Sequence, residues 1–246
     1  MSRQATGKGL HKSSMSDLPL NPDCFLCDYK NHNVLHCAAH ETIERINAGK
    51  DFTIFPRGKH LVTAGVKAEG FFFIKSGLVR SYVQLASGKE QTLRLSGPGD
   101  WVGFRDCISD SISHHNVVAV EDTHACYITG ALIDALVKDD SNFQKEVFRQ
   151  MAKEWREMEE HVVSLGTKQV HEKLAEILIV LDNAQGRKNH VELKVTRDVL
   201  ATFIGTKTET LVRALSDLKA REFISVDKNR IDILNRDALY SLSKIA

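Results

Sequence analysis

The sequence has neither a large excess of one charge nor a long hydrophobic run. Its 33 Lys and Arg residues nearly balance 32 Asp and Glu residues, giving a formal net charge of +1 over 246 residues. A nucleic-acid-binding surface would therefore have to be a local cluster of positive charge. No apolar stretch approaches the roughly 18 residues of a membrane span, and the N-terminal MSRQATGKGLHKSSMSD lacks the apolar core of a signal peptide. We therefore expect a cytoplasmic protein with no membrane partner.

Hydrophobic patterning divides the chain into four regions. Residues 1–20 are polar and rich in Gly, Ser and Lys, which predicts a disordered tail. Residues 21–130 hold a Cys-containing segment and then short apolar runs broken by glycine, such as EGFFFIKSG, which are typical of antiparallel strands in a β-roll sensor domain. Residues 131–166 have the spacing of a dimerisation helix, and residues 167–246 indicate shorter helices and a strand pair. The predicted fold class is α+β: an antiparallel β-roll, a long helix and a C-terminal winged helix-turn-helix.

The long predicted helix carries a narrow apolar stripe. Its members recur at alternating intervals of three and four residues, which is the spacing of a coiled-coil seam; they are Phe148, Met151, Trp155, Met158, Val162 and Leu165. The simplest partner for such a stripe is the same helix in a second copy of the chain, so we predict a homodimer. The alternative is that the stripe packs on its own β domain, although that contact usually needs a wider apolar face.

The segment TRDVLATFIGTKTETLVRALSDLKAREF has the pattern of a helix-turn-helix. Thr196 can cap the first helix, and Gly205 falls where a tight turn needs a positive φ. On the second helix, Glu209, Val212 and Arg213 share one exposed face near the N-terminus, where a recognition helix carries its base-reading side chains. Arg can donate two hydrogen bonds to guanine, and Glu can accept one from cytosine. Double-stranded DNA is therefore the predicted partner.

Further side chains around these helices suit the DNA backbone. Phosphates are favoured at a helix N-terminus and beside cationic or hydroxyl side chains. The predicted backbone contacts are Thr206, Lys207 and Thr208 in the turn, with Lys228 and Arg230 in the wing. The alternative is that Glu209 and Arg213 form an ordinary surface ion pair one helical turn apart.

The order of these pieces resembles the CRP/FNR superfamily of transcription regulators, the cyclic-AMP receptor protein and fumarate-nitrate reduction regulator family, and is closer to the FNR-like branch. The resemblance runs from about Cys24 onward and is carried by FFFIKSGLVRSY, SGKEQTLRLSGPGDWVGF, the long helix and TRDVLATFIGTKTETLVRAL. It implies a cupin-like β-roll of the cyclic-nucleotide-binding-domain fold, and a homodimer that binds a palindromic DNA site. It also implies RNA polymerase as a partner if the protein is an activator.

The resemblance also assigns individual positions. The family's Glu-x-x-x-Arg recognition pattern carries over to Glu209 and Arg213, with Val212 where relatives have Ser or Gly. In the oxygen-sensing branch a carboxylate on the seam keeps the apoprotein monomeric, and the matching position here is Met158. In GFRDCISDSISHHNVVAVED, Phe104 replaces the Glu of the family's cyclic-nucleotide pocket. Cyclic nucleotide is therefore not the expected effector.

Four of the five cysteines suggest a different sensor. Cys24 and Cys27 form a C-x2-C pair, Cys37 follows in the same segment, and Cys126 resembles the fourth ligand position of the oxygen-sensing branch. Four thiolates suit a [4Fe–4S] cluster that reports oxygen, nitric oxide or redox state. Cys107 is left as a structural residue.

Several alternatives for the sensor remain open. Zinc could take the same four cysteines, or three of them with His32, His36 or His40. A reversible Cys24–Cys27 disulfide, a small-molecule effector and unreactive free thiols are the other interpretations.

Two further classes of protein compete with a DNA-binding regulator. A cupin-like metalloenzyme is disfavoured because His114 and His115 are adjacent and would point to opposite faces of a strand. The sequence has no catalytic triad, phosphate-binding loop or dinucleotide motif, so we predict that it is not an enzyme. A sensor or interaction protein without DNA binding is disfavoured by the basic wing and by Glu209 and Arg213.

Overall fold

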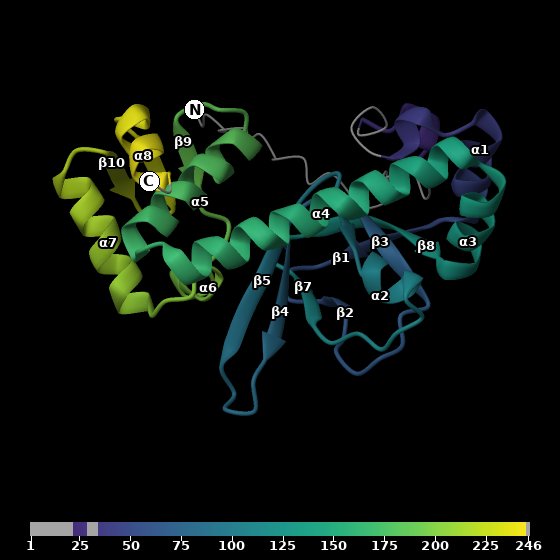
Figure 1. The fold of residues 1–246 in the computed structure, drawn as a ribbon, viewed down its shortest axis with the longest axis horizontal. Helices are drawn as coiled ribbons and strands as arrows, with labels where there is room; N and C mark the ends of the chain where they lie inside the picture. The colour runs from purple at the N-terminus through teal and green to yellow at the C-terminus, as the bar shows by residue number, and fades with distance from the viewer. Residues whose placement is uncertain (1–21, 29–33, 245–246) are drawn as a thin grey trace, which may run out of the picture.

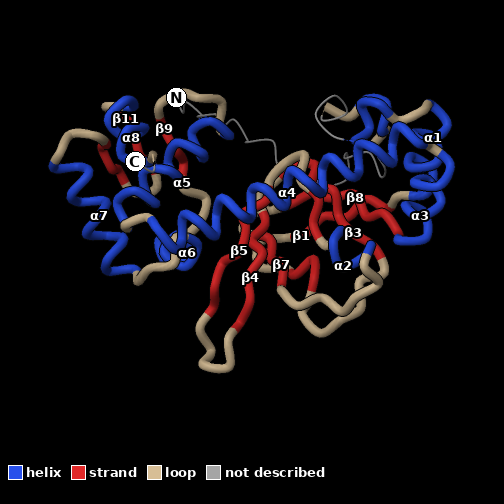
Figure 2. The backbone as a smooth tube through the Cα atoms, viewed as in Figure 1, coloured by secondary structure: helices blue, strands red, loops and turns tan. Residues whose placement is uncertain are grey.

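The computed structural model describes residues 22–28 and 34–244, and it divides into two lobes joined by one long helix (Figure 1). The predicted tail, residues 1–20, lies outside the described residues, as does His32. Among the helices of the described part, none combines the length and apolar character needed to cross a membrane. The predicted α+β class is confirmed, because the first lobe is built on antiparallel sheets and the second is mainly helical (Figure 2).

The first lobe is a roll of two four-stranded antiparallel sheets, with strand orders β1-β8-β3-β6 and β2-β7-β4-β5. The strands are β1 (Asp51–Phe55), β2 (His60–Val62), β3 (Gly70–Ser76), β4 (Val79–Gln84), β5 (Glu90–Ser96), β6 (Trp101–Val102), β7 (Asn116–Ala119) and β8 (Thr123–Thr129). Strands of both sheets contribute to one buried apolar cluster, made of Ile74, Val79, Val102, Val117 and Ala125. One short helix, α2 (Phe104–Ile108), interrupts the strand pattern.

Helices close one end of the roll, and they carry the cysteine segment. They are the 3-10 helices η1 (Cys24–Leu26) and η3 (Val34–Cys37), α1 (His40–Gly49), α3 (Gly130–Asp139) and the start of α4 (Ser141–Thr167). Phe71 of β3, Ile133 of α3 and Phe143 of α4 are all buried in the cluster that joins these helices to the sheets. The cysteine segment therefore packs into the same buried core as the first turns of the long helix.

One buried carboxylate, that of Asp140, serves the N-termini of two helices. It accepts hydrogen bonds from the backbone N–H groups of Asn142 and Phe143, each at 3.0 Å, and so caps α4. It also accepts from the N–H of Ala39 and the hydroxyl of Thr42, each at 2.7 Å, at the start of α1. Burial raises the pKa of Asp140, but these hydrogen bonds outweigh it and hold the pKa below its ordinary value.

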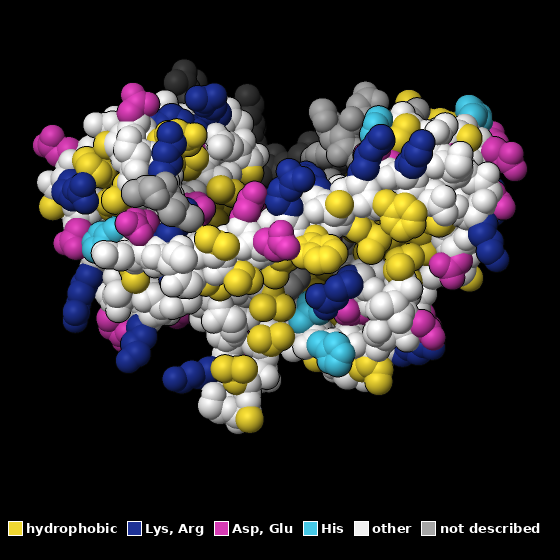
Figure 3. Space-filling view, in the orientation of Figure 1, with side chains coloured by type: hydrophobic (Ala, Val, Ile, Leu, Met, Phe, Trp, Pro, Cys, Tyr) yellow, Lys and Arg dark blue, Asp and Glu magenta, His cyan; other side chains and the backbone are white. Residues whose placement is uncertain are grey.

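Helix α4 has 27 residues, which corresponds to a rod of about 40 Å. Its first turns are buried on the roll, whereas most of the predicted seam faces outward: Phe148 is 59% exposed and Trp155 70% exposed. Met158 and Val162 are also exposed, while Met151 and Leu165 are partly buried. Figure 3 shows hydrophobic side chains gathered along this helix. Packing within the chain therefore leaves most of the stripe exposed, and the homodimer stays a prediction.

The second lobe is a helical domain with a small sheet. Its elements are α5 (Val170–Ala184), β9 (His190–Glu192), α6 (Arg197–Phe203), α7 (Thr208–Ala220), β10 (Ile224–Asp227), β11 (Arg230–Ile233) and α8 (Arg236–Ser243). The strands pair antiparallel in the order β10-β11-β9, which confirms the predicted hairpin. Leu174, Leu200 and Leu211 are fully buried between the helices.

The two lobes also meet directly, through β5 and α6. The hydroxyl groups of Thr92 and Thr202 are 2.6 Å apart, and the Gln91 side-chain amide donates to the Thr202 carbonyl. Nearby, the Lys194 ammonium group pairs with Glu121 at 2.7 Å. The orientation of the second lobe is therefore set by polar contacts with the roll as well as by α4.

The double cap by Asp140 predicts a large stability effect. Asp140→Ala should lower the free energy of unfolding by at least about 2 kcal/mol, because a lost N-cap costs about 1 kcal/mol and each hydrogen bond to a charged acceptor about 1.5–3 kcal/mol. Urea denaturation measures the difference. The control is Asp139→Ala, since the Asp139 side chain is 60% exposed in a surface ion pair with Arg45 and its loss should change stability by about 0–1 kcal/mol.

The same variant predicts a pH dependence. The folded-state pKa of Asp140 is below its ordinary value of 3.8, so its contribution is complete above about pH 4 and is lost as the pH falls through the folded pKa. The stability gap between wild type and Asp140→Ala should therefore narrow at acidic pH. A gap that stays constant at acidic pH would show that folding does not lower the pKa of Asp140.

Candidate functional site

The helix-turn-helix is formed by α6, a turn and α7, and its two predicted local signals are present. The Thr196 hydroxyl accepts a hydrogen bond from the Val199 N–H at 3.3 Å and caps α6. Gly205 has a φ of +67°, and a Cβ placed on it would lie 3.0 Å from a methyl group of Leu165 at the end of α4. The turn therefore needs glycine at this position for two reasons: the positive φ and the close approach of the long helix.

The predicted recognition face is open to solvent. Glu209, Val212 and Arg213 are all exposed, and the opposite face of α7 is buried through Leu211 and Leu215. Among the described residues no ion pair joins Glu209 to Arg213, although they are one helical turn apart. Both side chains are therefore available for contacts outside the chain, which favours the base-reading interpretation over the surface ion pair.

Of the side chains predicted to contact the DNA backbone, some are exposed and others already make hydrogen bonds within the chain. Lys207 precedes α7 as its exposed N-cap residue, and its side chain makes no cap hydrogen bond, whereas Thr206 is half-buried. The Thr208 hydroxyl donates to Asp198 at 2.6 Å. In the wing, Lys228 is exposed at a φ of +50°, while Arg230 donates to Asp232 at 2.7 Å. Among the side chains predicted to contact phosphates, Lys207 and Lys228 are thus the cations most available for such a contact.

Arg197 was not anticipated from the sequence. Its guanidinium donates to the backbone carbonyl of Lys228 at 2.8 Å and so ties the wing turn to the start of α6. The contact joins residues 31 positions apart, and no local pattern signals it.

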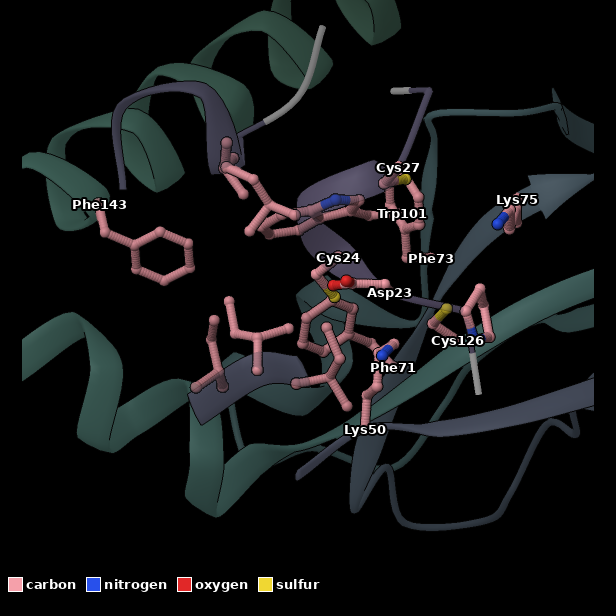
Figure 4. Close-up of a pocket in the computed structure, with 16 residues that line it drawn as sticks. Asp23, Cys24, Cys27, Lys50, Phe71, Phe73, Lys75, Trp101, Cys126 and Phe143 are labelled. Atoms are coloured by element: carbon pink, nitrogen blue, oxygen red, sulfur yellow. The ribbon is translucent and has the colours of Figure 1, made fainter. Parts of the chain in front are cut away.

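Three of the four predicted cluster ligands meet in one cavity. Cys24 and Cys27, on and just after η1, and Cys126, on β8, line a cavity of about 40 Å³ (Figure 4). The other walls are mainly apolar and include Phe71, Phe73, Trp101 and Phe143, with the charged residues Asp23, Lys50 and Lys75. Cys24 and Cys126 are buried, and all five cysteines are free thiols.

Burial and charge act in opposite directions on these thiols. Burial raises the pKa of Cys126 to about 11, while Lys50 and Lys75 act to lower it. Burial also raises the pKa of Cys24, and the ammonium group of Lys50 opposes that shift. Without a bound cation the thiols of Cys24 and Cys126 are therefore protonated at neutral pH, and metal binding would have to release their protons.

Cys37 lies apart from this cavity, on η3 against α4. Its Sγ is 3.8 Å from a carboxylate oxygen of Glu146 and 4.0 Å from Nδ1 of His36. Burial and the Glu146 carboxylate raise the pKa of the Cys37 thiol. One potential metal-ligating atom from each of Cys37, His36 and Glu146 falls within 4.8 Å of the others. The structure thus brings together three predicted cluster ligands and places the fourth in a second donor group.

The remaining sequence candidates are also located. Cys107, on α2, does not line the thiol cavity and faces Gly130, whose added Cβ would lie 3.1 Å from its Sγ. His40 pairs with Glu44 at 3.4 Å on α1. His115 faces the buried Asp106 carboxylate at 3.5 Å, and burial lowers its pKa, whereas His114 is exposed.

The position where the family's cyclic-nucleotide pocket has Glu is filled by core packing. Phe104 is buried, and its ring lies 4.9 Å from that of Phe71 and 4.5 Å from that of Trp101. An aromatic side chain facing inward cannot accept a ribose hydroxyl. This packing supports the expectation that cyclic nucleotide is not the effector.

Comparison with known families divides the chain at the same place as the fold. Residues 52–140 match the family described as cyclic nucleotide-binding domain, and residues 172–242 match the family described as Crp-like helix-turn-helix domain. The fumarate and nitrate reduction regulatory protein of Vibrio cholerae is 27% identical over 194 residues, 77% of each chain. Its counterpart in Escherichia coli K12 is 27% identical over 191 residues, 76% of each chain.

Solved structures show the same architecture. FixK2 from Bradyrhizobium japonicum aligns with a TM-score of 0.75 at 24% identity, covering 80% of this chain and 98% of that one. A CRP-family transcriptional regulator from Thermus thermophilus aligns with a TM-score of 0.65 at 21% identity, covering 78% of this chain and 96% of that one. The order of roll, long helix and winged helix is therefore shared with these proteins.

The turn between α6 and α7 gives a testable prediction. Gly205→Ala should lower the free energy of unfolding by about 1–2 kcal/mol, because a Cβ is disfavoured at positive φ and this one would also crowd Leu165. The matched control is Gly166→Ala on α4, where an added Cβ meets nothing within 4 Å. It should raise stability by up to about 1 kcal/mol through helix propensity. Equal effects at both sites in thermal unfolding would contradict the assigned turn.

Proposed function

The chain belongs to the CRP/FNR family of DNA-binding transcription regulators, and we propose that it binds a palindromic DNA site as a homodimer and reports oxygen, nitric oxide or redox state through a [4Fe–4S] cluster. The observation that carries the DNA-binding part is the exposed face of Glu209, Val212 and Arg213 at the N-terminus of α7. The cluster is supported by the convergence of Cys24 and Cys126 with Cys27 in one cavity.

In the proposed complex α7 lies in the major groove. Arg213 donates to guanine O6 and N7, and Glu209 accepts from cytosine N4. Val212 lies between them and offers only an apolar contact, which suits a thymine methyl group. Lys207 and Lys228 contact phosphates on either side, so they add affinity and little sequence preference.

Loss of Arg213 tests this assignment. Arg213→Ala should weaken specific binding by about 1–3 kcal/mol, because one bidentate base contact is lost. The measurement is a binding titration on a palindrome selected from random DNA, at fixed salt. Lys219→Ala is the control, since Lys219 is exposed on the same helix at its other end. Equal affinities for wild type and Arg213→Ala would show that α7 is not the reading helix.

The proposed dimer is formed through the stripe on α4. Two α4 helices packed along Phe148, Trp155 and Val162 would bury side chains that are exposed in the single chain. Burial of apolar surface stabilises such a contact by roughly 25 cal/mol per Å². A parallel pair of these helices would present two copies of α7, as a palindromic site with two half-sites requires.

Met158→Asp tests the dimer. It places two carboxylates close together in an apolar seam, where an unpaired charge is costly to bury, so we expect monomers by sedimentation velocity. Arg156→Asp changes the charge of the same helix outside the stripe and should remain dimeric. If Met158→Asp sediments as the wild type does, α4 pairs through another face or not at all.

The donor set partly fits the proposed cluster. Cys24, Cys27 and Cys126 would hold it, and the proposed fourth ligand, Cys37, is on η3 beside Glu146. A cavity of about 40 Å³ takes only a few waters, so loading would require η1 to shift outward. When bound, such a cluster supplies sensitivity to oxygen and nitric oxide. The chain's own part is to connect the thiols to α4, through the segment that Asp140 anchors.

Zinc is the second candidate, and a specific contact favours it. The donor atoms of His36, Cys37 and Glu146 already lie within 4.8 Å of one another. Zinc ligands lie about 2.0–2.3 Å from the metal, so small side-chain movements would complete a three-ligand site. Such a site would join the cysteine segment to α4 directly.

Single Cys→Ser variants separate these candidates after anaerobic reconstitution with iron and sulfide. Broad absorbance near about 400 nm should be lost in Cys24→Ser, Cys27→Ser, Cys37→Ser and Cys126→Ser. Cys107→Ser should keep the absorbance, because Cys107 does not line the cavity. A colourless protein whose bound zinc is removed by Glu146→Gln would contradict the cluster and support the zinc site.

A further inference from the structure

Lys50 is a buried cation without a carboxylate partner. Its side chain is in the thiol cavity, and the residue is only 4% exposed. The ammonium group donates to Asn47 at its Oδ1, 2.8 Å away, and more weakly to its carbonyl oxygen at 3.4 Å. In the described part of the chain no carboxylate lies within ion-pair distance of it. Asp23 lines the same cavity, but its carboxylate accepts the Phe25 N–H at 2.9 Å.

Such a group is costly to keep in the core. A buried ammonium loses its hydration, and neutral hydrogen-bond partners restore only part of the lost interaction. Most of the surrounding walls, Phe71 and Trp101 among them, are apolar, and Asp23, the carboxylate of the lining, forms no ion pair with Lys50 in the described part of the chain. A methionine would fill the same space without this cost. The charge is therefore better explained by something anionic that shares the cavity.

The position of Lys50 relative to the thiols is fixed by one amide. Asn47 Oδ1 accepts both from Lys50 and from the backbone N–H of Cys24, the latter at 2.9 Å. The ammonium group is thereby held beside η1, and Figure 4 shows it pointing into the space between Cys24 and Cys126. Its charge acts on both thiols and favours their anionic forms.

We propose that Lys50 is the charge-compensating residue of the thiol cavity, held by Asn47 to neutralise part of the negative charge of a thiolate-ligated iron–sulfur group. This inference rests on the cluster proposed above. A [4Fe–4S] group with thiolate ligands is anionic, and charge and hydrogen bonding around such a group set its potential and stability. Lys75 also lines the cavity but is only half-buried, so water screens its charge more strongly.

The proposal predicts effects of opposite sign in the empty and the loaded protein. In the metal-free, reduced protein, Lys50→Met should raise the unfolding midpoint, because an uncompensated buried charge is removed. In the anaerobically loaded protein the same variant should release iron to a chelator severalfold faster than wild type. The reduction potential of the cluster in this variant should also be more negative, because removing a nearby positive charge disfavours electron uptake. Lys50→Arg should stay close to wild type in potential, and Lys75→Met should have the smaller effect on iron release.

The outcomes distinguish this inference from the proposed cluster. If the wild type takes up no iron and sulfide, the cluster and the role of Lys50 are both wrong. If the wild type loads and Lys50→Met keeps its iron and its potential unchanged, only the role of Lys50 is overturned. A lower unfolding midpoint for metal-free Lys50→Met would also overturn it, because the charge would then be compensated within the chain.

Discussion

The arrangement of the first lobe depends on one carboxylate shared by two helices. Asp140 satisfies backbone N–H groups at the beginning of both α1 and α4, which have no partner within their own helices. Because η1 packs against α1, the same carboxylate also fixes where Cys24 and Lys50 lie relative to the long helix. The thiol cavity and the start of α4 are therefore connected through one hydrogen-bonded centre.

The second lobe is held by contacts of two kinds. Leu165 at the end of α4 packs against the Gly205 turn, and three apolar side chains of the roll, Leu78, Leu95 and Val120, pack against the core of the second lobe. Thr92, which is fully buried, and Thr202 make a hydroxyl contact between the roll and α6. A hydrogen bond within the protein replaces hydrogen bonds to water, so its net contribution to stability is modest. The apolar contacts therefore contribute most of the stability with which the roll and α4 hold the second lobe.

Local signals predicted most of the fold, including the helix-turn-helix and the hairpin that follows it. The Thr196 cap, the positive φ of Gly205 and the hairpin after α7 each depend on residues within a few positions, and the structure has all three. The apolar stripe on α4 was predictable for the same reason, since helical periodicity repeats along one element.

The thiol site was only partly predictable. Sequence spacing identified the cysteines, but Cys37 meets Glu146 from 109 positions away, and Asp140 meets Ala39 across 101 positions. The cation of the cavity was missed as well, because a lysine is expected at the surface and only the packing of the aromatic walls shows Lys50 to be buried. At a rod length of about 40 Å, a tilt of about 5° where α4 meets Asp140 would move its far end by about 3.5 Å. A helix of this length therefore converts a small angle at the thiol end into a displacement comparable to the rise of one base pair.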